Sequence, residues 1–209
     1  MLSGSLLNCA LFGIWKVSSI INAAQPHSHV QQLVAILGTV TVVAASLLLL
    51  RQHNFKRLWA YSSIENVGLM VFAIGLGSGP LFFLQALNHS LAKVALFLLT
   101  GNIMQASGTK KLNKMHGVIE DCPIWALLLT LAAFAVTGAP PFGAFVAEMS
   151  MLSLSMADER WVLALIMTVA IAISFVAICA HMGKVILGPA KQGFRKFQPI
   201  RAAIIPAVL

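Results

Sequence analysis

The sequence predicts an all-α fold, a polytopic bundle of transmembrane helices. Its residues are 59% hydrophobic and 10% charged, with a mean hydropathy of +0.89, whereas about a quarter of the residues of a soluble domain are charged. The apolar stretches run about 18–25 residues, which is the length that crosses a ~30 Å hydrocarbon layer as a helix. They lack the alternating pattern of barrel strands. Because lipid offers the backbone no hydrogen-bond partners, we expect the spans to be helices.

Six full spans and the start of a seventh are expected, forming one transmembrane domain over residues 1–209. The spans are residues 3–21, 30–50, 58–76, 81–105, 123–156 and 161–187, and the seventh starts at residues 200–209. A Gly-Ser-Gly-Pro turn at residues 77–80 separates the third span from the fourth. Asp121 could cap the fifth span, and Pro123 suits a first helical turn.

The fifth span is expected to be one broken helix. Residues 123–156 would make a straight helix of ~50 Å, too long for one crossing. The segment contains Gly138, Pro140, Pro141 and Gly143, and the prolines remove amide donors and force a break. Two separate spans would each be short and would place the basic C-terminal segment outside the cell. One discontinuous span fits better, and in transporters such helices mark the ion site.

Basic residues predict the orientation. They follow the second, fourth and sixth spans, whereas the loops between carry at most one: Arg51, Lys56, Arg57; Lys110, Lys111, Lys114; Lys191, Arg195, Lys196. By the positive-inside rule, the N-terminus and these basic loops are cytoplasmic. The net charge of +8 and the pI of about 9.9 are therefore read as a topology signal. With no nucleic-acid motif beside them, no nucleic-acid partner is expected.

Two positions inside the spans predict a proton path, since ionisable residues at membrane depth usually serve function. His89 and Lys93 are four residues apart in the fourth span and share one helix face. Lys93 lies about 18 Å from either end of its span, too far for easy snorkelling. Glu148 follows the proline break. A lone carboxylate there would bind a proton, so a proton carrier is favoured over a structural hydrogen bond that stabilises the break.

Other ionisable residues lie nearer the span ends. Glu65, close to the cytoplasmic end of the third span, either takes part in the path or faces a loop lysine such as Lys56. His181 and Lys184 lie near the cytoplasmic end of the sixth span, where Lys184 can snorkel. Lys16 is expected to be an interfacial anchor.

Catalytic and metal chemistry find no support in the sequence. Cys9, Cys122 and Cys179 are scattered, without a CxxC pair, and are interpreted as packing residues rather than a metal or disulfide set. Neither a nucleotide loop, nor a haem ligand pair, nor a nucleophile–base set is present. A mixture of buried lysine, histidine and acids is what a proton relay needs.

Three segments occur in the same order in a known family. They are KRLWAYSSIENVG at residues 56–68, NHSLAKVALFL at 88–98, and GAPPFG at 138–143 leading to Glu148. Together they resemble the antiporter-like, proton-conducting membrane subunits of complex I and its relatives, over essentially the whole chain. The SIENVG wording at residues 63–68 is most similar to the hydrogenase-4 and formate hydrogenlyase branch, its component F type in particular.

The resemblance implies a specific architecture. The chain would be the second of two inverted repeats, preceded by the last helix of the first. Because both ends fall at or inside spans, we expect a C-terminal-half fragment or one product of a split gene. Some relatives carry a lysine near the position of Asn8. The asparagine of this chain cannot titrate. The implied relay runs through Lys93 and Glu148, with His89 bridging them, and with Glu65 and Lys56 near the cytoplasmic side.

The expected function is that of a proton-translocating subunit of a respiratory or hydrogenase-type, NADH dehydrogenase-like oxidoreductase complex in a bacterial or archaeal cell (inner) membrane. No cofactor is expected in this chain. Iron–sulfur clusters and nickel–iron or quinone sites would lie in partner subunits: other membrane subunits and a hydrophilic redox arm. The alternatives are a multi-subunit sodium/proton antiporter subunit and a non-conducting membrane scaffold. An independent solute carrier is disfavoured because no cluster of polar residues for such a solute is present.

Overall fold

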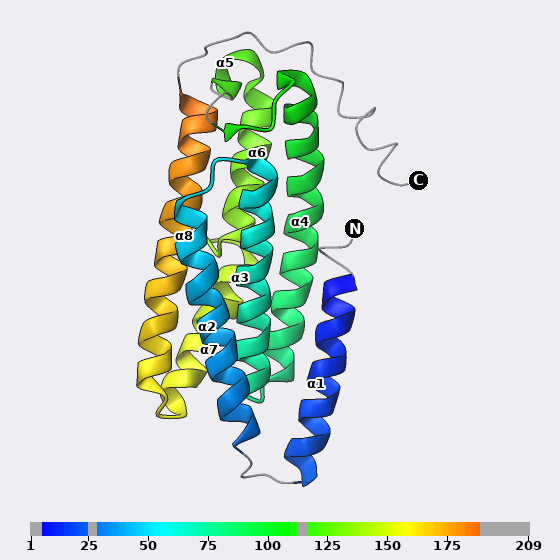
Figure 1. Ribbon diagram of the computed structural model, residues 1–209, viewed down its shortest axis with the longest axis vertical. Coiled ribbons are helices and arrows are strands. Elements are labelled where there is room, and N and C mark those ends of the chain that lie inside the picture. The colour runs from blue at the N-terminus through cyan, green and yellow to red at the C-terminus, as the bar shows by residue number, and fades with distance from the viewer. Residues whose placement is uncertain (1–5, 25–28, 113–116, 189–209) are drawn as a thin grey trace.

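The computed structural model describes residues 6–24, 29–112 and 117–188, and these form a helical bundle (Figure 1). The helices are α1 (Leu7–Ala24), α2 (Val30–Leu50), α3 (Phe55–Gly75), α4 (Gly79–Ser107), α5 (Val118–Asp121), α6 (Pro123–Val136), α7 (Gly143–Ala157) and α8 (Trp161–Leu187). The predicted all-α membrane bundle is confirmed.

Five helices are long and apolar enough to cross a membrane, namely α1, α2, α3, α4 and α8. The shorter α6 and α7 follow one another along the bundle as two halves of one discontinuous element (Figure 1), as predicted for residues 123–156. The expected start of a seventh span lies outside the described residues. The chain is therefore a multi-pass integral membrane protein.

Capping at the starts of two helices differs from the prediction. The third helix begins at Phe55 rather than Leu58, since the side chain of Asn54 accepts a hydrogen bond from Lys56 N at 3.0 Å and so stabilises an earlier start. The expectation that Asp121 caps the fifth span is wrong. Asp121 ends the short helix α5, and the residue before α6 is Cys122, while Pro123 does occupy the first turn of α6.

Helix α3 is the most buried of the five long helices, and its contact with α2 depends on glycine. A β-carbon added at Gly38 would lie 2.5 Å from Phe72 N and 2.8 Å from Gly68 O, both backbone atoms. One added at Gly68 would lie 2.7 Å from a methyl group of Val42. The absence of side chains lets the two backbones approach closely, as small residues do between helices in membranes. This contact fixes α3 in the middle of the bundle.

The described basic loops lie at one end of the bundle, the upper end in Figure 1. Phe55 N donates to Lys110 O at 3.2 Å, and Leu112 N donates to His53 O at 3.0 Å. These bonds join the loop after α2 to the loop after α4. The alternation of basic and bare loops thus corresponds to two ends of the molecule, and the assignment of the basic end to the cytoplasm stays a prediction. Lys114 and the residues after Gly188 lie outside the described part.

Helix α1 lies at the side of the bundle next to α4 (Figure 1). Trp15 stacks on Phe82 with ring centroids 6.3 Å apart. Asn8 donates from its amide to Ala86 O at 3.1 Å and to Ser90 Oγ at 2.8 Å. The neutral residue Asn8 therefore ties α1 to α4. Lys16 is exposed and lies 5.2 Å from the Trp15 ring centroid, a position compatible with the expected anchor.

Candidate functional site

The break between α6 and α7 is the centre of the site. Helix α6 ends at Val136 and α7 begins at Gly143, as the Gly138–Gly143 motif predicts. Between them, Gly138 has φ +66°, in the left-handed region that glycine adopts most readily, and the Pro140–Pro141 bond is cis. Asn88 of α4 packs against this region, since a β-carbon at Gly143 would lie 2.6 Å from its Oδ1. Gly138 and Ala139 on the α6 side of the break are buried, whereas Pro140 and Pro141 are exposed.

Glu148 points back toward the break. It lies in the second turn of α7 and is 3% exposed. Its carboxylate lies against Gly138, so closely that a β-carbon added there would collide with both carboxylate oxygens. The acid therefore sits between the end of one half-helix and the start of the other, where no side chain at residue 138 would fit.

Lys93 is held by α3. It is 1% exposed, and its Nζ donates to Trp59 O at 2.8 Å and to Ser62 Oγ at 3.1 Å. The same Nζ lies 5.7 Å from the centroid of the Trp59 ring, within range of a cation–π interaction. A buried ammonium group needs such partners, and this lysine is anchored to α3 in the middle of α4.

Glu65 lies in the middle of α3, ten residues after its start at Phe55, and not near the helix end. It is 5% exposed. It interacts electrostatically with Lys93 and with Glu148, and Ser174 of α8 faces the same carboxylate. Of the two readings of Glu65, pairing with a loop lysine such as Lys56 is therefore wrong. The earlier helix start at Phe55 is the reason, because it moves Glu65 deeper into the bundle.

His89 lies one turn before Lys93 on the same buried face of α4 and is 1% exposed. Its predicted role as a bridge to Glu148 stays a prediction. The remaining candidates lie apart from this group. Lys56 and Lys184 are exposed near the basic end. His181 is half-buried, with its Nε2 3.1 Å from Leu49 O, so it links α8 to the last turn of α2.

Several polar residues of the site were missed by the sequence analysis. Each of them lies in or next to the site and contacts other residues of the site. They are Trp59, Ser62, Asn66, Gln85, Asn88 and Ser174. For two of them a signal existed. Gln85 lies four residues before His89, and Asn66 directly follows Glu65, so both are polar residues inside an apolar span.

The cysteines and the acids give no sign of a metal site. Among the described residues, no group of three or more His, Cys, Asp or Glu side chains is placed to hold a metal ion. Cys122 and Cys179 are half-buried, whereas Cys9 is exposed on α1. The interpretation of Cys9 as a packing residue is wrong, because α1 has little of its surface covered by the bundle.

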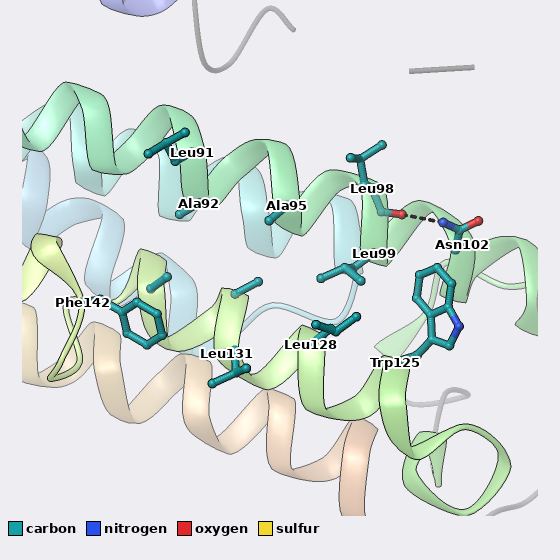
Figure 2. A pocket seen from close by; sticks show the side chains of 12 residues that line it. Leu91, Ala92, Ala95, Leu98, Leu99, Asn102, Trp125, Leu128, Leu131 and Phe142 are labelled. Atoms are coloured by element: carbon teal, nitrogen blue, oxygen red, sulfur yellow. Dashed lines mark hydrogen bonds between the residues drawn. The ribbon is translucent and has the colours of Figure 1, made fainter. Parts of the chain in front are cut away.

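An apolar groove lies outside the polar site, between α4 and α6. It has a volume of about 470 Å³, and Figure 2 shows Leu91, Leu98, Leu131 and Trp125 along its walls. Asn102 in this groove donates to Leu98 O of its own helix at 3.1 Å. Leu91 and Leu131 are exposed, so the groove opens on the outer surface of the bundle. None of its lining residues is titratable, and we do not include it in the proton site.

The site therefore joins three ionisable side chains from three elements. Lys93 comes from α4, Glu65 from α3 and Glu148 from α7, and Glu65 is the electrostatic neighbour of both others. Groups coupled in this way change one another's proton affinity whenever one of them gains or loses a proton. Such an arrangement is suited to passing protons.

Comparison with known proteins gives a consistent result. The family model described as "NADH:quinone oxidoreductase/Mrp antiporter, TM" matches residues 1–174. A hydrogenase-4 component F homolog of Methylacidiphilum infernorum is 32% identical over 210 residues, which cover 99% of this chain and 43% of the relative. This similarity agrees with the resemblance seen in residues 56–68, 88–98 and 138–148.

Two solved structures share the fold. A chain of the membrane-bound sulfane sulfur reductase, an archaeal respiratory membrane complex, matches with a TM-score of 0.87 and 24% identity, covering 100% of this chain and 44% of that one. A chain of the Mrp complex from Dietzia sp. matches with a TM-score of 0.82 and 21% identity, covering 90% and 36%. The present chain thus spans less than half the length of these relatives.

Proposed function

Because the chain belongs to the NADH:quinone oxidoreductase/Mrp antiporter family of transmembrane subunits, we propose that it is a proton-translocating membrane subunit of a larger oxidoreductase complex. The observation that carries this proposal is the buried series Lys93, Glu65 and Glu148, in which the middle residue interacts electrostatically with both others. The series ends at a helix break, the feature that marks ion sites in transporters.

Protons would pass along this series by stepwise changes of charge. Lys93, held by Trp59 O and Ser62 Oγ, carries a proton as an ammonium group. Loss of that proton removes a positive neighbour of Glu65, and Glu65 in turn alters the field at Glu148. Moving one proton against 100 mV costs ~2.3 kcal/mol, so the energy must come from elsewhere in the assembly.

The partners in this proposal are other membrane subunits and a hydrophilic redox arm. The similar proteins named above include a hydrogenase-4 component F homolog and a chain of a respiratory membrane complex, which supports an oxidoreductase assembly in a bacterial or archaeal cell membrane. Iron–sulfur clusters and nickel–iron or quinone sites would lie in those partners. The first repeat would come from the rest of the full-length subunit or from another chain.

The decisive experiment compares the native complex with Glu148→Gln in proteoliposomes, following proton uptake and electron transfer in the same samples. We expect proton uptake to fall while the complex stays assembled. Glu120→Gln is the matched control, since Glu120 is an exposed acid on α5. If uptake is unchanged in an intact Glu148→Gln complex, Glu148 is structural and the scaffold alternative becomes the better one. A requirement for Na⁺ in the native sample would favour the antiporter alternative instead.

A further inference from the structure

Two buried amides, Asn66 of α3 and Gln85 of α4, connect three helices at the site. Gln85 is 0% exposed and Asn66 is 1% exposed. Gln85 Nε2 donates to Asn66 Oδ1 at 2.9 Å. Asn66 Nδ2 donates to Ser62 O at 2.9 Å and, more weakly, to Val136 O at 3.5 Å. One hydrogen-bonded pair thus reaches from α4 through α3 to the last residue of α6.

The contact with Val136 falls at the open end of the half-helix. The last carbonyls of a helix lack partners within it and need donors from elsewhere. Thr137 N donates to Ala133 O and Ala139 N donates to Phe134 O, while Val136 O receives the Asn66 amide. Gly138, which lies against the Glu148 carboxylate, follows two residues later. The amide pair therefore fixes the chain immediately before the contact with Glu148.

The same pair is also connected to Lys93, through Ser62. Ser62 accepts from Asn66 at its backbone oxygen and from Lys93 at its side-chain oxygen. Gln85 precedes His89 by four residues and Lys93 by eight, so the three side chains follow one face of α4, and all are buried. The positions of Lys93 and Glu148 are thereby both linked to the contact between Gln85 and Asn66.

Amides suit this task because they do not titrate. Their hydrogen bonds persist whatever the charge on Glu65, Lys93 or Glu148, and a buried amide that loses its partner is unfavourable. We propose that Asn66 and Gln85 are positioning residues, which hold the open end of α6, and with it the Glu148 carboxylate, in fixed register with Lys93. This inference rests on the proposed proton-translocating function.

The test uses the assembled native complex in proteoliposomes with Asn66→Leu and Gln85→Leu, which keep side-chain bulk and remove the hydrogen bonds. We expect the number of protons moved per electron to fall roughly threefold to tenfold, the equivalent of one hydrogen bond. Hydrogen exchange of the backbone amides at residues 137–139 and at Phe142 should become faster. The exchanged pair, Asn66→Gln with Gln85→Asn, retains two amides and should recover much of both properties.

Asn102→Leu is the matched control, because Asn102 is also an amide on α4 but its side chain donates to Leu98 O of its own helix. If Asn66→Leu does not assemble, Gln85→Met removes the donor while keeping a flexible side chain, and it decides the question alone. Unchanged proton coupling and unchanged exchange in an assembled variant would overturn the inference. Glu148→Gln is measured in parallel. If this variant also leaves proton pumping intact, the proposed function itself fails. If proton pumping is lost in Glu148→Gln but not in the amide variants, only the positioning role is refuted.

Discussion

The carboxylate of Glu148 lies against Gly138, on the opposite side of the break between α6 and α7. A helix N-terminus favours a negative charge and a helix C-terminus disfavours it. Glu148 lies in the second turn of α7, with its carboxylate directed back toward the start of that helix, and through Gly138 it is near the end of α6. The two half-helices therefore act on its charge in opposite directions. Such a balance suits a group that binds a proton and releases it again.

Replacing Gly138 by alanine should disturb Glu148 directly. The new methyl group would collide with the carboxylate, and φ +66° is unfavourable for any residue with a β-carbon. We expect roughly 1–3 kcal/mol of lost stability and reduced proton uptake, measured by thermal dissociation of the purified complex and by proteoliposome assays. Gly183→Ala on α8 is the control, since a β-carbon there meets nothing within 4 Å. Equal behaviour of the two variants would show that the Gly138–Glu148 contact is unimportant.

Ser62→Ala tests the anchoring of Lys93. The variant removes one of two acceptors of Nζ and leaves Trp59 O in place. Proton transfer should slow by roughly threefold to tenfold, the effect of about one hydrogen bond, with the amount of assembled complex unchanged. Proton uptake at matched electron transfer is the measurement. Ser46→Ala serves as the control because Ser46 is also buried but donates to Val43 O within α2. A native rate in Ser62→Ala would mean that Trp59 O alone positions the lysine.

Glu65→Gln should be as damaging as Glu148→Gln, because Glu65 is the electrostatic neighbour of both other ionisable groups. Since the residues act in series, the double variant should lose little more than either single variant. Lys56→Gln should leave proton uptake unchanged, as Lys56 is exposed and lies about 13 Å before Glu65 along α3. Additive losses in the double variant would contradict a single path, and a strong effect of Lys56→Gln would restore the rejected pairing.

The parts that could be predicted from sequence are those set by local composition. Long apolar stretches require helices in lipid, and Pro140 with Pro141 requires a break, so the spans and the discontinuity followed directly. Lys93 and Glu148 stood out because charge is rare at membrane depth. The depth of Glu65 could not be predicted, since it depends on where α3 starts, and that start depends on the Asn54 cap.

Contacts between helices could not be predicted from the sequence, for a different reason. The bonds from Gln85 to Asn66 and from Asn66 to Val136 depend on how α3, α4 and α6 are rotated against one another. Helix rotation in a membrane is set by packing with neighbours rather than by the hydrophobic pattern alone. In α3, buried residues surround the helix on most sides, so no single apolar face indicates which side chains meet.

Gly38→Ala should loosen the bundle and the site together. The added carbon would lie 2.5 Å from Phe72 N and 2.8 Å from Gly68 O, and backbone atoms cannot move aside without separating α2 from α3. We expect a loss of roughly 1–3 kcal/mol, typical of overpacking, seen as a lower dissociation temperature. Because α3 carries Ser62 and Glu65, proton uptake per assembled complex should fall as well. Gly13→Ala on α1, where a β-carbon meets nothing within 4 Å, should change neither property. Normal stability in Gly38→Ala would show that α2 and α3 can separate without cost, and that their close approach does not hold the site.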